Sequence, residues 1–406
     1  MSDPSSLSEN VARLRKARNL SQEELAEAAA VGVDTVGRIE RGERRTVRPQ
    51  TMERLARALG VRPAALLGGA RTAAVVTAAD VAQLRAAIGS VGEFLGVVEF
   101  ADGDGVPPLG EVQAVGRRAW EYYVAGRTSE LLALLPPLLT DSRRLVHSSA
   151  GDAQAVGHRA LALSYRLGAG LAGRLGLHDL AWSSAERAVL AARQSDAVEI
   201  ETAVSFRYLA WVLVRQGRVD EAVRVAVRAA ETVEPGMLDA DPAKAGVFGN
   251  LLFNAASAAV LAGRGDQARE YLAIARATAV RHGHDHASEA AIFGPRAVGL
   301  QTVDLAVRLG DPERALRLAA RLPRTGGKLP RFWEAGHRLH LARAAADLRR
   351  TQDALAYLDE AREIAPTWSA QQPLAKSTMN ALVDRAARRP GETFARLAAH
   401  YGVAAS

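Results

Sequence analysis

The densest group of side chains that could bind a metal lies at residues 282–286, with the sequence HGHDH. Imidazole and carboxylate groups are common ligands of zinc and related metals, but a metal site needs three of them to converge. This segment falls at a junction between two predicted helical repeats, where glycine and polar residues are expected in any case. His337 and His340 lie three residues apart, without the H-E-x-x-H pattern of zinc proteases. We therefore expect no bound metal.

Other catalytic chemistry lacks its characteristic residues. The chain has no cysteine, which excludes disulfides, zinc–thiolate sites, iron–sulfur clusters and a cysteine nucleophile. It contains no G-x-x-x-x-G-K-[ST] phosphate loop, no dinucleotide-binding fingerprint and no G-x-S-x-G motif. The loop DGDG at 102–105 is followed by Val106 and Gln113, where a calcium loop has an oxygen ligand and a bidentate glutamate. We expect neither a cofactor nor enzymatic activity.

The composition is that of a folded chain with at least two domains. It has 406 residues, of which 48% are hydrophobic and 24% charged, and its mean hydropathy is −0.05. The first residues lack the apolar stretch of a secretory signal, and no segment approaches 18 uncharged apolar residues. We therefore expect a cytoplasmic protein without a membrane partner.

The net charge of +7 comes almost wholly from arginine, because only four of the 52 basic residues are lysines. Richness in arginine and alanine is typical of GC-rich genomes and says little about function. Residues 1–69 nevertheless carry 12 basic and 9 acidic side chains, which makes them several times more basic per residue than the rest. This bias indicates a polyanionic partner for the N-terminal segment.

The N-terminal basic residues lie among short helices predicted over residues 8–68. Ser21 and Glu24 form the S-x-x-E capping box of the second helix. Asp34 is expected to cap a third helix that ends at Gly42. A basic loop then leads to a fourth helix, and a further apolar segment closes the core.

In order, length and spacing, these elements resemble the Cro/repressor type of helix-turn-helix, the XRE family. The resemblance covers residues 8–68 and rests on the strings LSQEELA, VGVDTVGRIERG and RPQTMERLARALGV. It implies a five-helix domain that binds double-stranded DNA with its third helix in the major groove. The chain departs from the family's pattern at Ala30, where many members have a turn glycine.

The resemblance also implies which residues contact the DNA. Gln22, at the start of the second helix, would clamp a phosphate, and Arg38 would read a guanine bidentately. Thr35 would touch a thymine methyl group or a phosphate, and the later arginines would bind backbone phosphates. The full set is Gln22, Val33, Asp34, Thr35, Gly37, Arg38, Arg41, Arg44, Arg45 and Arg48. The alternative is a bundle of the same shape that binds a protein instead.

The remaining residues repeat one pattern: a helix end, a turn with Gly or Arg, and a small residue a few positions into the next helix. The small residues are alanines spaced 41, 46, 47 and 39 residues apart, namely Ala181, Ala222, Ala268, Ala315 and Ala354. Small side chains let paired helices approach closely, and each pair covers its neighbour's apolar face. The pattern resembles tetratricopeptide repeats (TPR), with a degenerate first copy at 120–137 and terminal helices at 377–388 and 392–401. The alternative is an irregular helical bundle.

A TPR-like solenoid has a concave face lined by the first helix of each pair. Aligning the repeats on their alanines places ten residues on or near it: Arg166, Arg207, Tyr208, Asn250, Phe253, Asn254, Gln301, Asp304, His340 and Arg343. Asn250 and Asn254 are four residues apart and so share one helical face, where two amides could hold an extended peptide. Alternatively, both amides satisfy neighbouring helices or water.

A helix-turn-helix joined to such repeats is the plan of the bacterial peptide-pheromone receptors, which the chain resembles in architecture and in its two asparagines. That resemblance implies a quorum-sensing regulator whose groove binds a peptide or small-molecule effector. A single small domain buries too little surface to select a site in a genome, so we expect a homodimer on paired half-sites. The repeats, being large, are expected to form the dimer interface.

We thus predict an all-α protein with three segments. They are a helix-turn-helix domain at 1–68, a linker and connecting helix at 69–110, and a TPR-like α-solenoid at 111–406. The first functional hypothesis is a ligand-sensing, sequence-specific transcriptional regulator. The second is an interaction protein whose repeats recruit or sequester a partner, with the DNA contact only localising it. In a third, the repeats have no ligand and only hold the dimer together.

Overall fold

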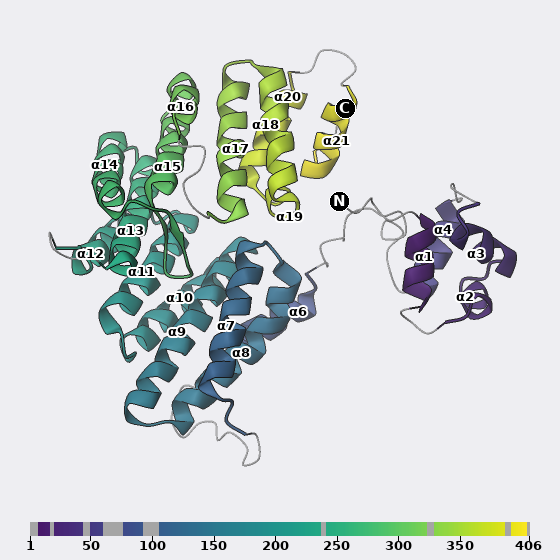
Figure 1. Ribbon diagram of the computed structural model, residues 1–406, viewed down its shortest axis with the longest axis horizontal. Coiled ribbons are helices and arrows are strands. Elements are labelled where there is room, and N and C mark those ends of the chain that lie inside the picture. Colours follow the sequence, from purple (N-terminus) through teal and green to yellow (C-terminus); the bar gives the residue numbers. More distant parts are fainter. Residues whose placement is uncertain are drawn as a thin grey trace. The chain divides into compact units, whose positions relative to one another are not determined.

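The computed structural model describes residues 7–16, 20–43, 49–59, 76–91, 105–236, 241–322, 329–385 and 391–403. They belong to two compact units, Met1–Val75 and Val76–Ser406, each visible in Figure 1. Apart from one short β-hairpin, the regular structure of the described residues is helical. The chain therefore has the all-α fold that its sequence predicts.

The described helices of the first unit enclose one apolar core. They are α1 (Leu7–Lys16), α2 (Gln22–Ala28), α3 (Val33–Glu40) and α4 (Pro49–Ala58). Each helix contributes side chains that are fully buried, among them Val11, Leu25, Val36 and Leu55. The predicted fifth helix and the basic loop after α3 lie outside the described residues.

Local signals determine where α2 and α3 begin. The capping box of α2 is confirmed, because the backbone N–H of Glu24 donates to Ser21 Oγ at 3.1 Å and the N–H of Ser21 donates to the Glu24 carboxylate at 2.7 Å. The predicted start of α3 is wrong, since Gly32 precedes the helix and Asp34 lies inside its first turn. A carboxylate in the first turn is still favoured by the helix dipole.

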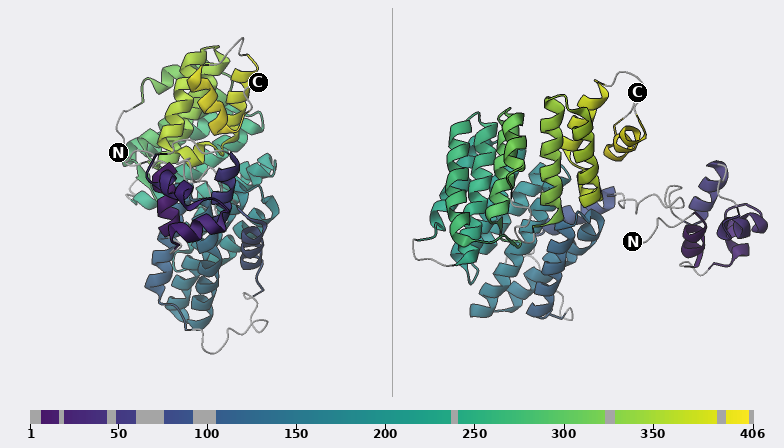
Figure 2. Two further views of the ribbon diagram at one scale, coloured as in Figure 1. Left: turned by 90° about the vertical axis from the view of Figure 1, so that its right-hand side faces the viewer. Right: turned by 45° about the horizontal axis from the view of Figure 1, so that its top comes forward.

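The described part of the second unit contains six helical hairpins stacked side by side (Figure 2). The first helices of the six pairs are α7 (Leu109–Val124), α9 (Gly151–Arg174), α11 (Val198–Arg215), α13 (Pro242–Leu261), α15 (Pro295–Arg308) and α17 (Arg331–Asp347). The second helices are α8 (Thr128–Ser148), α10 (His178–Ala192), α12 (Val219–Thr232), α14 (Gly265–His282), α16 (Pro312–Ala319) and α18 (Thr351–Ile364). The TPR-like solenoid predicted from the repeated alanines is confirmed.

The turn inside each hairpin has the same geometry. A residue with positive φ follows the first helix, and the next N–H bonds back across the last helical turn, as from Arg218 to Leu213 O and from Arg350 to Ala345 O. This is the Schellman arrangement, which favours glycine because its left-handed backbone crowds a Cβ atom. Five of the six turns have glycine there, and the sixth has Arg349, with φ 59°.

The repeated alanines lie where two helices of a pair meet. Each is the fourth residue of its second helix and is fully buried: Ala181, Ala222, Ala268, Ala315 and Ala354. The first pair has Leu131 at this position, and it is also buried. The predicted degenerate first repeat is therefore a complete helical hairpin with a larger side chain at the contact.

Additional helices cover the two ends of the solenoid. Helix α6 (Ala78–Ile88) packs on α8 through Leu84 and Ile88 and belongs to the second unit. Three helices follow the sixth hairpin: α19 (Pro366–Ser369), α20 (Pro373–Val383) and α21 (Glu392–Tyr401).

Helix α19 also reaches the first hairpin, and the sixth hairpin reaches the second (Figure 1). A Cβ atom on Gly126, in the turn between α7 and α8, would lie 3.2 Å from Trp368 Cβ. The Arg174 guanidinium, at the end of α9, lies 5.7 Å from the centre of the Phe332 ring. The Phe332 and Trp368 rings in turn lie 5.7 Å apart. We call these four residues the closure contact.

Helix α13 is the one described helix that is long and apolar enough to cross a membrane. The sequence predicted no such helix, because the polar residues Asn250 and Asn254 interrupt the apolar stretch of α13. Within that window 72% is buried against the rest of the unit, which is the environment of a core helix.

Candidate groove site and DNA-binding helix

A β-hairpin between α14 and α15 covers part of the solenoid's inner surface. Its strands β1 (His286–Ala287) and β2 (Ile292–Phe293) pair antiparallel. The turn between them bonds to α9 and α11, and β2 packs on α13. These are three successive first helices, which contact one another along the stack and line the concave face. We call residues 286–293 the groove hairpin.

Glu289, at the tip of the groove hairpin, forms a buried ion pair with Arg166. The Arg166 side chain is only 2% exposed and binds both Glu289 carboxylate oxygens, at 3.0 and 2.8 Å. Its third nitrogen binds Glu201 at 2.7 Å and Ser205 Oγ at 3.3 Å. The contact therefore joins residues that are 123 positions apart in the sequence.

The charges of this cluster compensate the cost of burial. Burial alone would raise the pKa of Glu289, but the guanidinium groups of Arg166 and Arg207 more than offset it, and the pKa lies below its usual range. Burial would likewise lower the pKa of Arg166, but Glu289 and Glu201 raise it. Both partners are thus ionised at neutral pH, as a paired buried charge must be.

One polar atom beside Glu289, Nε of Arg207, is buried without a hydrogen-bond partner among the described residues. The buried Tyr208 hydroxyl faces the Glu289 carboxylate and helps to lower the pKa of Glu289. The Arg207 guanidinium stacks 4.3 Å from the centre of the Tyr208 ring, and its Nη2 donates to the backbone oxygen of Glu289 at 2.8 Å. Burial raises the pKa of Tyr208 well above its usual value, so the phenol stays protonated. The cluster therefore has unused hydrogen-bonding capacity.

The two asparagines that we expected in the groove bond to backbone carbonyls of the protein itself. The Asn250 amide donates to Ile292 O in β2 at 2.9 Å, and the Asn254 amide donates to Arg207 O at 2.8 Å. The ring of Phe253 lies 5.6 Å from that of Phe293. The structure thus brings together around the groove hairpin six of the ten predicted groove residues: Arg166, Arg207, Tyr208, Asn250, Phe253 and Asn254.

Two more predicted groove residues form a separate cluster between α15 and α17. Asp304 lies 3.1 Å from His340 Nε2 and 2.7 Å from Arg308 Nε. Burial lowers the pKa of His340, whereas that of Asp304 lies below its usual range because His340 and Arg308 outweigh its burial. Arg343 pairs with Asp347 on its own helix. Gln301 is half-buried on α15.

The acidic residue of the HGHDH segment has a structural partner. Asp285 accepts hydrogen bonds from the backbone N–H groups of Arg296 and Ala297 at 3.1 and 3.0 Å, and so caps α15. The described residues contain no group of three or more His, Asp or Glu side chains placed to hold a metal ion. The side chain of His282 is outside this description.

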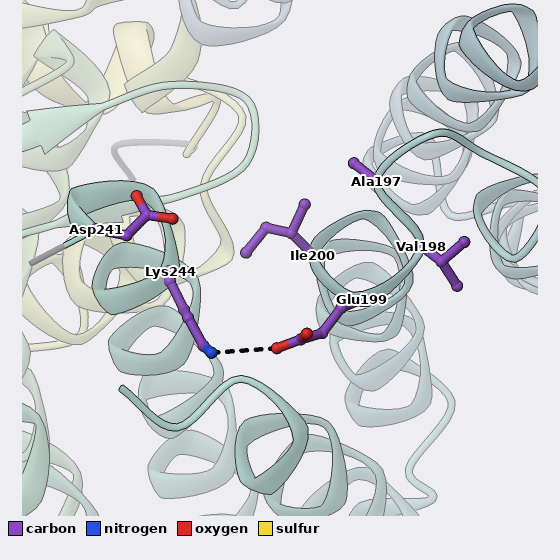
Figure 3. A pocket seen from close by; sticks show the side chains of 6 residues that line it. All are labelled: Ala197, Val198, Glu199, Ile200, Asp241 and Lys244. Carbon is purple, nitrogen blue, oxygen red and sulfur yellow. Dashed lines mark ion pairs between the residues drawn. The ribbon is translucent and has the colours of Figure 1, made fainter. Parts of the chain in front are cut away.

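A separate depression of about 420 Å³ lies between the N-terminal ends of α11 and α13 (Figure 3). Lys244 and Glu199 face each other across it, 3.3 Å apart. None of the predicted groove residues lines this depression. Its open, ion-paired walls make it a weaker candidate for a specific site than the cluster around Glu289.

In the first unit, α3 has one face in the core and one in solvent. Val36 and Ile39 are fully buried. Gly37, which we expected on the outer face, is buried as well: a Cβ atom there would lie 3.0 Å from Arg41 Nη1 and 3.5 Å from Gln22 Oε1. Its small size therefore serves the packing of α2 against α3.

The solvent face of α3 presents charged side chains. Asp34, Arg38 and Arg41 are exposed, as is Val33 at 42%. Arg38 Nη1 lies 3.8 Å from Asp34, and Arg38 Nε lies 3.7 Å from Glu43. Arg41 Nε binds Glu43 at 2.7 Å, a hydrogen bond that holds the pKa of Glu43 below its usual range. Exposed pairs of this kind exchange readily for phosphate contacts.

Of the other DNA contacts predicted on α3 and in the basic loop after it, one lies within the described residues and three lie outside them. Thr35 is half-buried near the front of α3. Arg44, Arg45 and Arg48 lie outside the described residues.

A hydrogen-bond network fixes α3 against α1 and α2. Arg15 on α1 binds both carboxylate oxygens of Glu40 on α3, at 2.7 and 2.9 Å. The Gln22 amide, expected to clamp a phosphate, donates to the same carboxylate at 2.7 Å. The hydrogen bond that Arg15 donates to Glu40 raises the pKa of Arg15. We call Arg15, Gln22 and Glu40 the α3 anchor.

The helix-turn-helix family model matches residues 11–66. The first unit is a helix-turn-helix domain. The match confirms the XRE-type resemblance and supports a DNA-binding regulator rather than an enzyme. The comparison with curated proteins finds no match.

Two solved structures are similar to the chain over most of its length. One is BtubC (BKLC) from P. vanneervenii, with 16% identity, a TM-score of 0.38, and 69% of this chain and 95% of that chain covered. The other is Bacillus thuringiensis PlcR in complex with the peptide PapR7 and DNA, with 11% identity, a TM-score of 0.37, and 91% and 98% covered. The assignment of the helix-turn-helix domain rests on the family match alone.

Two acidic partners of the groove, Glu201 and Glu289, and the groove hairpin itself were not predicted from the sequence. The spacing of the repeated alanines gave no distinct signal for the hairpin, because the two that flank it are 47 residues apart and the preceding two are already 46 apart. The α3 anchor was missed because its residues come from three different helices.

Proposed function

We propose that the protein is a cytoplasmic, sequence-specific transcriptional regulator that binds double-stranded DNA with α3. The observation that carries this proposal is the solvent face of α3 in a helix-turn-helix domain. There, Arg38 and Arg41 pair, among the described residues, with the exposed carboxylates of Asp34 and Glu43. A guanidinium in the major groove binds the O6 and N7 atoms of guanine bidentately, and one at the edge binds phosphate. Arg38 takes the first role and Arg41 the second.

The proposal includes a homodimer on paired half-sites, joined through the repeat unit. One helix-turn-helix domain contacts too few base pairs for genomic selectivity, and two copies read two half-sites about one helical turn apart. The repeat unit is also proposed to sense a peptide or small-molecule effector on its concave face. The polar cluster around Glu289, in which the buried Nε of Arg207 has no partner among the described residues, supports a binding surface there.

The test is selection of binding sites from randomised DNA duplexes, with wild type, Arg38→Ala and the control Arg228→Ala. Arg228 is an exposed arginine of α12 that pairs with Glu231. Wild type and Arg228→Ala should select the same two-part site. Arg38→Ala should lose about ten- to a hundredfold of its preference for that site while keeping its fold, because one bidentate base contact is removed.

If Arg38→Ala selects the same site with wild-type affinity, the base-reading role of Arg38 is wrong. If wild type selects no site and binds DNA only with a steep salt dependence, the regulator itself is wrong and the interaction protein becomes the better hypothesis.

A further inference from the structure

The groove hairpin contacts the inner surface as a bound peptide would. Its tip presents a carboxylate to Arg166, its backbone carbonyl at Ile292 accepts from Asn250, and its aromatic side chain at Phe293 enters a pocket on α13. We infer that residues 286–293 are an internal ligand of the groove, and that the effector is a peptide that displaces them. The effector carries a carboxylate four residues before an aromatic side chain, as Glu289 and Phe293 do. This inference rests on the proposed sensing role of the repeat unit.

The carboxylate end of the site is built for an anion. Arg166 offers two parallel donors, which match a carboxylate in geometry as well as in charge. Arg207 adds a donor to the adjacent backbone carbonyl. The unpartnered Nε of Arg207 lies in the same cluster, and the Tyr208 hydroxyl faces the Glu289 carboxylate. A carboxylate ligand that also engages Arg207 Nε would gain a hydrogen bond that Glu289 does not make.

The aromatic end of the site depends on a glycine. A Cβ atom on Gly249 would lie 1.9 Å from the Phe293 ring, so only glycine admits the ring at that depth. Phe253 flanks the ring at 5.6 Å, and Trp333 lies 6.1 Å from Phe253. Phe293 is 1% exposed. The pocket thus accepts a flat aromatic group from any peptide that follows the same path.

The groove hairpin is suited to leave the site. Each strand has two residues, and an isolated two-stranded hairpin is marginal in water, so its position depends on the groove. Gly283 and Gly294 flank it with φ of 82° and 145°, values that few other residues adopt. Asp285, outside the strands, caps α15 and would keep the chain in register when the hairpin leaves.

The experiment measures binding of a labelled peptide with the sequence of residues 286–294, HASEAAIFG, to full-length protein in the absence of DNA. In wild type the tethered hairpin competes at a high effective concentration. Glu289→Gln weakens the hairpin and leaves Arg166 paired with Glu201. It should bind the peptide at least about tenfold more tightly than wild type does. The peptide HASQAAIFG should bind both proteins more weakly than HASEAAIFG.

Three further variants make the result specific. Phe293→Ala weakens the hairpin without changing a charge and should also bind the peptide more tightly, which keeps the test valid if Glu289→Gln misfolds. Glu334→Gln removes another bidentate pair, with Arg296 at 2.6 Å, and should bind as wild type does. Adding Gly249→Ala to Glu289→Gln should abolish binding, because the new methyl group fills the aromatic pocket.

Hydrogen exchange measures the displacement of the groove hairpin directly. When the peptide saturates wild type, the amides of the groove hairpin should exchange faster, while those of α9 and α11 should not. The inference is overturned if no variant binds the peptide, if wild type and the weakened variants bind equally, or if the hairpin keeps its protection. Site selection on the same proteins separates the two proposals. If a protein selects its DNA site but fails the peptide-binding and exchange tests, the proposed DNA-binding role stands and the internal-ligand inference is wrong.

Discussion

Ala30, between α2 and α3, has the left-handed backbone conformation that alanine adopts at a cost, with φ of 48°. Replacing it with glycine removes the crowding of Cβ but adds freedom to the unfolded chain. We expect Ala30→Gly to raise the free energy of unfolding of the first unit by roughly 0.5–1 kcal/mol in urea denaturation. The control is Ala28→Gly, at the last residue of α2, which should lower it by up to about 1 kcal/mol. A loss of stability in Ala30→Gly would mean that the conformation carries no strain.

His337, buried on α17, makes the stability of the second unit depend on pH. Burial lowers its pKa to about 3, with smaller contributions from Arg338, His340 and Arg296. Above pH 6.5 the histidine is neutral in both states and contributes nothing. Below that, the unfolded chain takes up a proton that the folded chain excludes, so stability falls until the pH reaches the folded-state pKa.

We expect His337→Gln to flatten this dependence by as much as about 1.4 kcal/mol per pH unit between pH 6 and 4. Urea denaturation at pH 7, 6, 5 and 4 measures it. The exposed His178, replaced in the same way, serves as the control. Parallel curves for wild type and His337→Gln would show that His337 is protonated in the folded protein.

For single residues, the sequence predicts interactions between residues that are close in the chain and misses those between residues that are far apart in it. The Ser21–Glu24 capping box lies within one turn, and the exposure of Arg38 follows from helical periodicity. The pairing of Arg166 with Glu289 spans 123 positions, and nothing in either local sequence marks it. Gly37 lies between Val36 and Arg38 in the sequence, and only the packing of α2 shows that it is buried.

Among the elements, α3 depends on the α3 anchor for its orientation. Glu40→Gln removes the bidentate bond to Arg15 and the charge that Gln22 faces. We expect it to lower the free energy of unfolding of the first unit by about 1–2 kcal/mol and to weaken DNA binding, because α3 is less firmly placed. Urea denaturation and a DNA titration of the same protein measure both effects.

The matched control is Glu43→Gln, three residues further on. Glu43 pairs with Arg41 at the exposed surface, so stability should hardly change, and DNA binding should become stronger because Arg41 is released. Equal effects of the two substitutions on stability would contradict the anchoring role of Glu40.

The order and pairing of the repeats could be predicted because each carries its own turn and its own small residue at the helix contact. The groove hairpin could not, since the 47-residue interval from Ala268 to Ala315 is only one residue longer than that from Ala222 to Ala268, where the described residues contain no such hairpin. The start of α3 was misplaced by two residues because aspartate is favoured both as a cap and inside the first turn.

For the second unit as a whole, the closure contact joins the ends of the solenoid. Trp368→Ala removes its largest side chain, and we expect a loss of about 2 kcal/mol, with faster hydrogen exchange in both α7–α8 and α17–α19. Trp182→Ala, on α10 of the second hairpin, should affect its own and adjacent hairpins but not α17–α19. An effect of Trp368→Ala confined to α17–α19 would show that the ends are not coupled.

The closure contact also has a consequence for synthesis. Gly126 leaves the ribosome long before Trp368 is made, and at about 5–20 residues per second the interval is tens of seconds. During that time the early repeats can form, because each needs only its neighbour, but the closure contact cannot form. A nascent or prematurely terminated chain therefore has stacked repeats without the closure contact. The two ends of the solenoid become coupled only when synthesis of the chain is nearly complete.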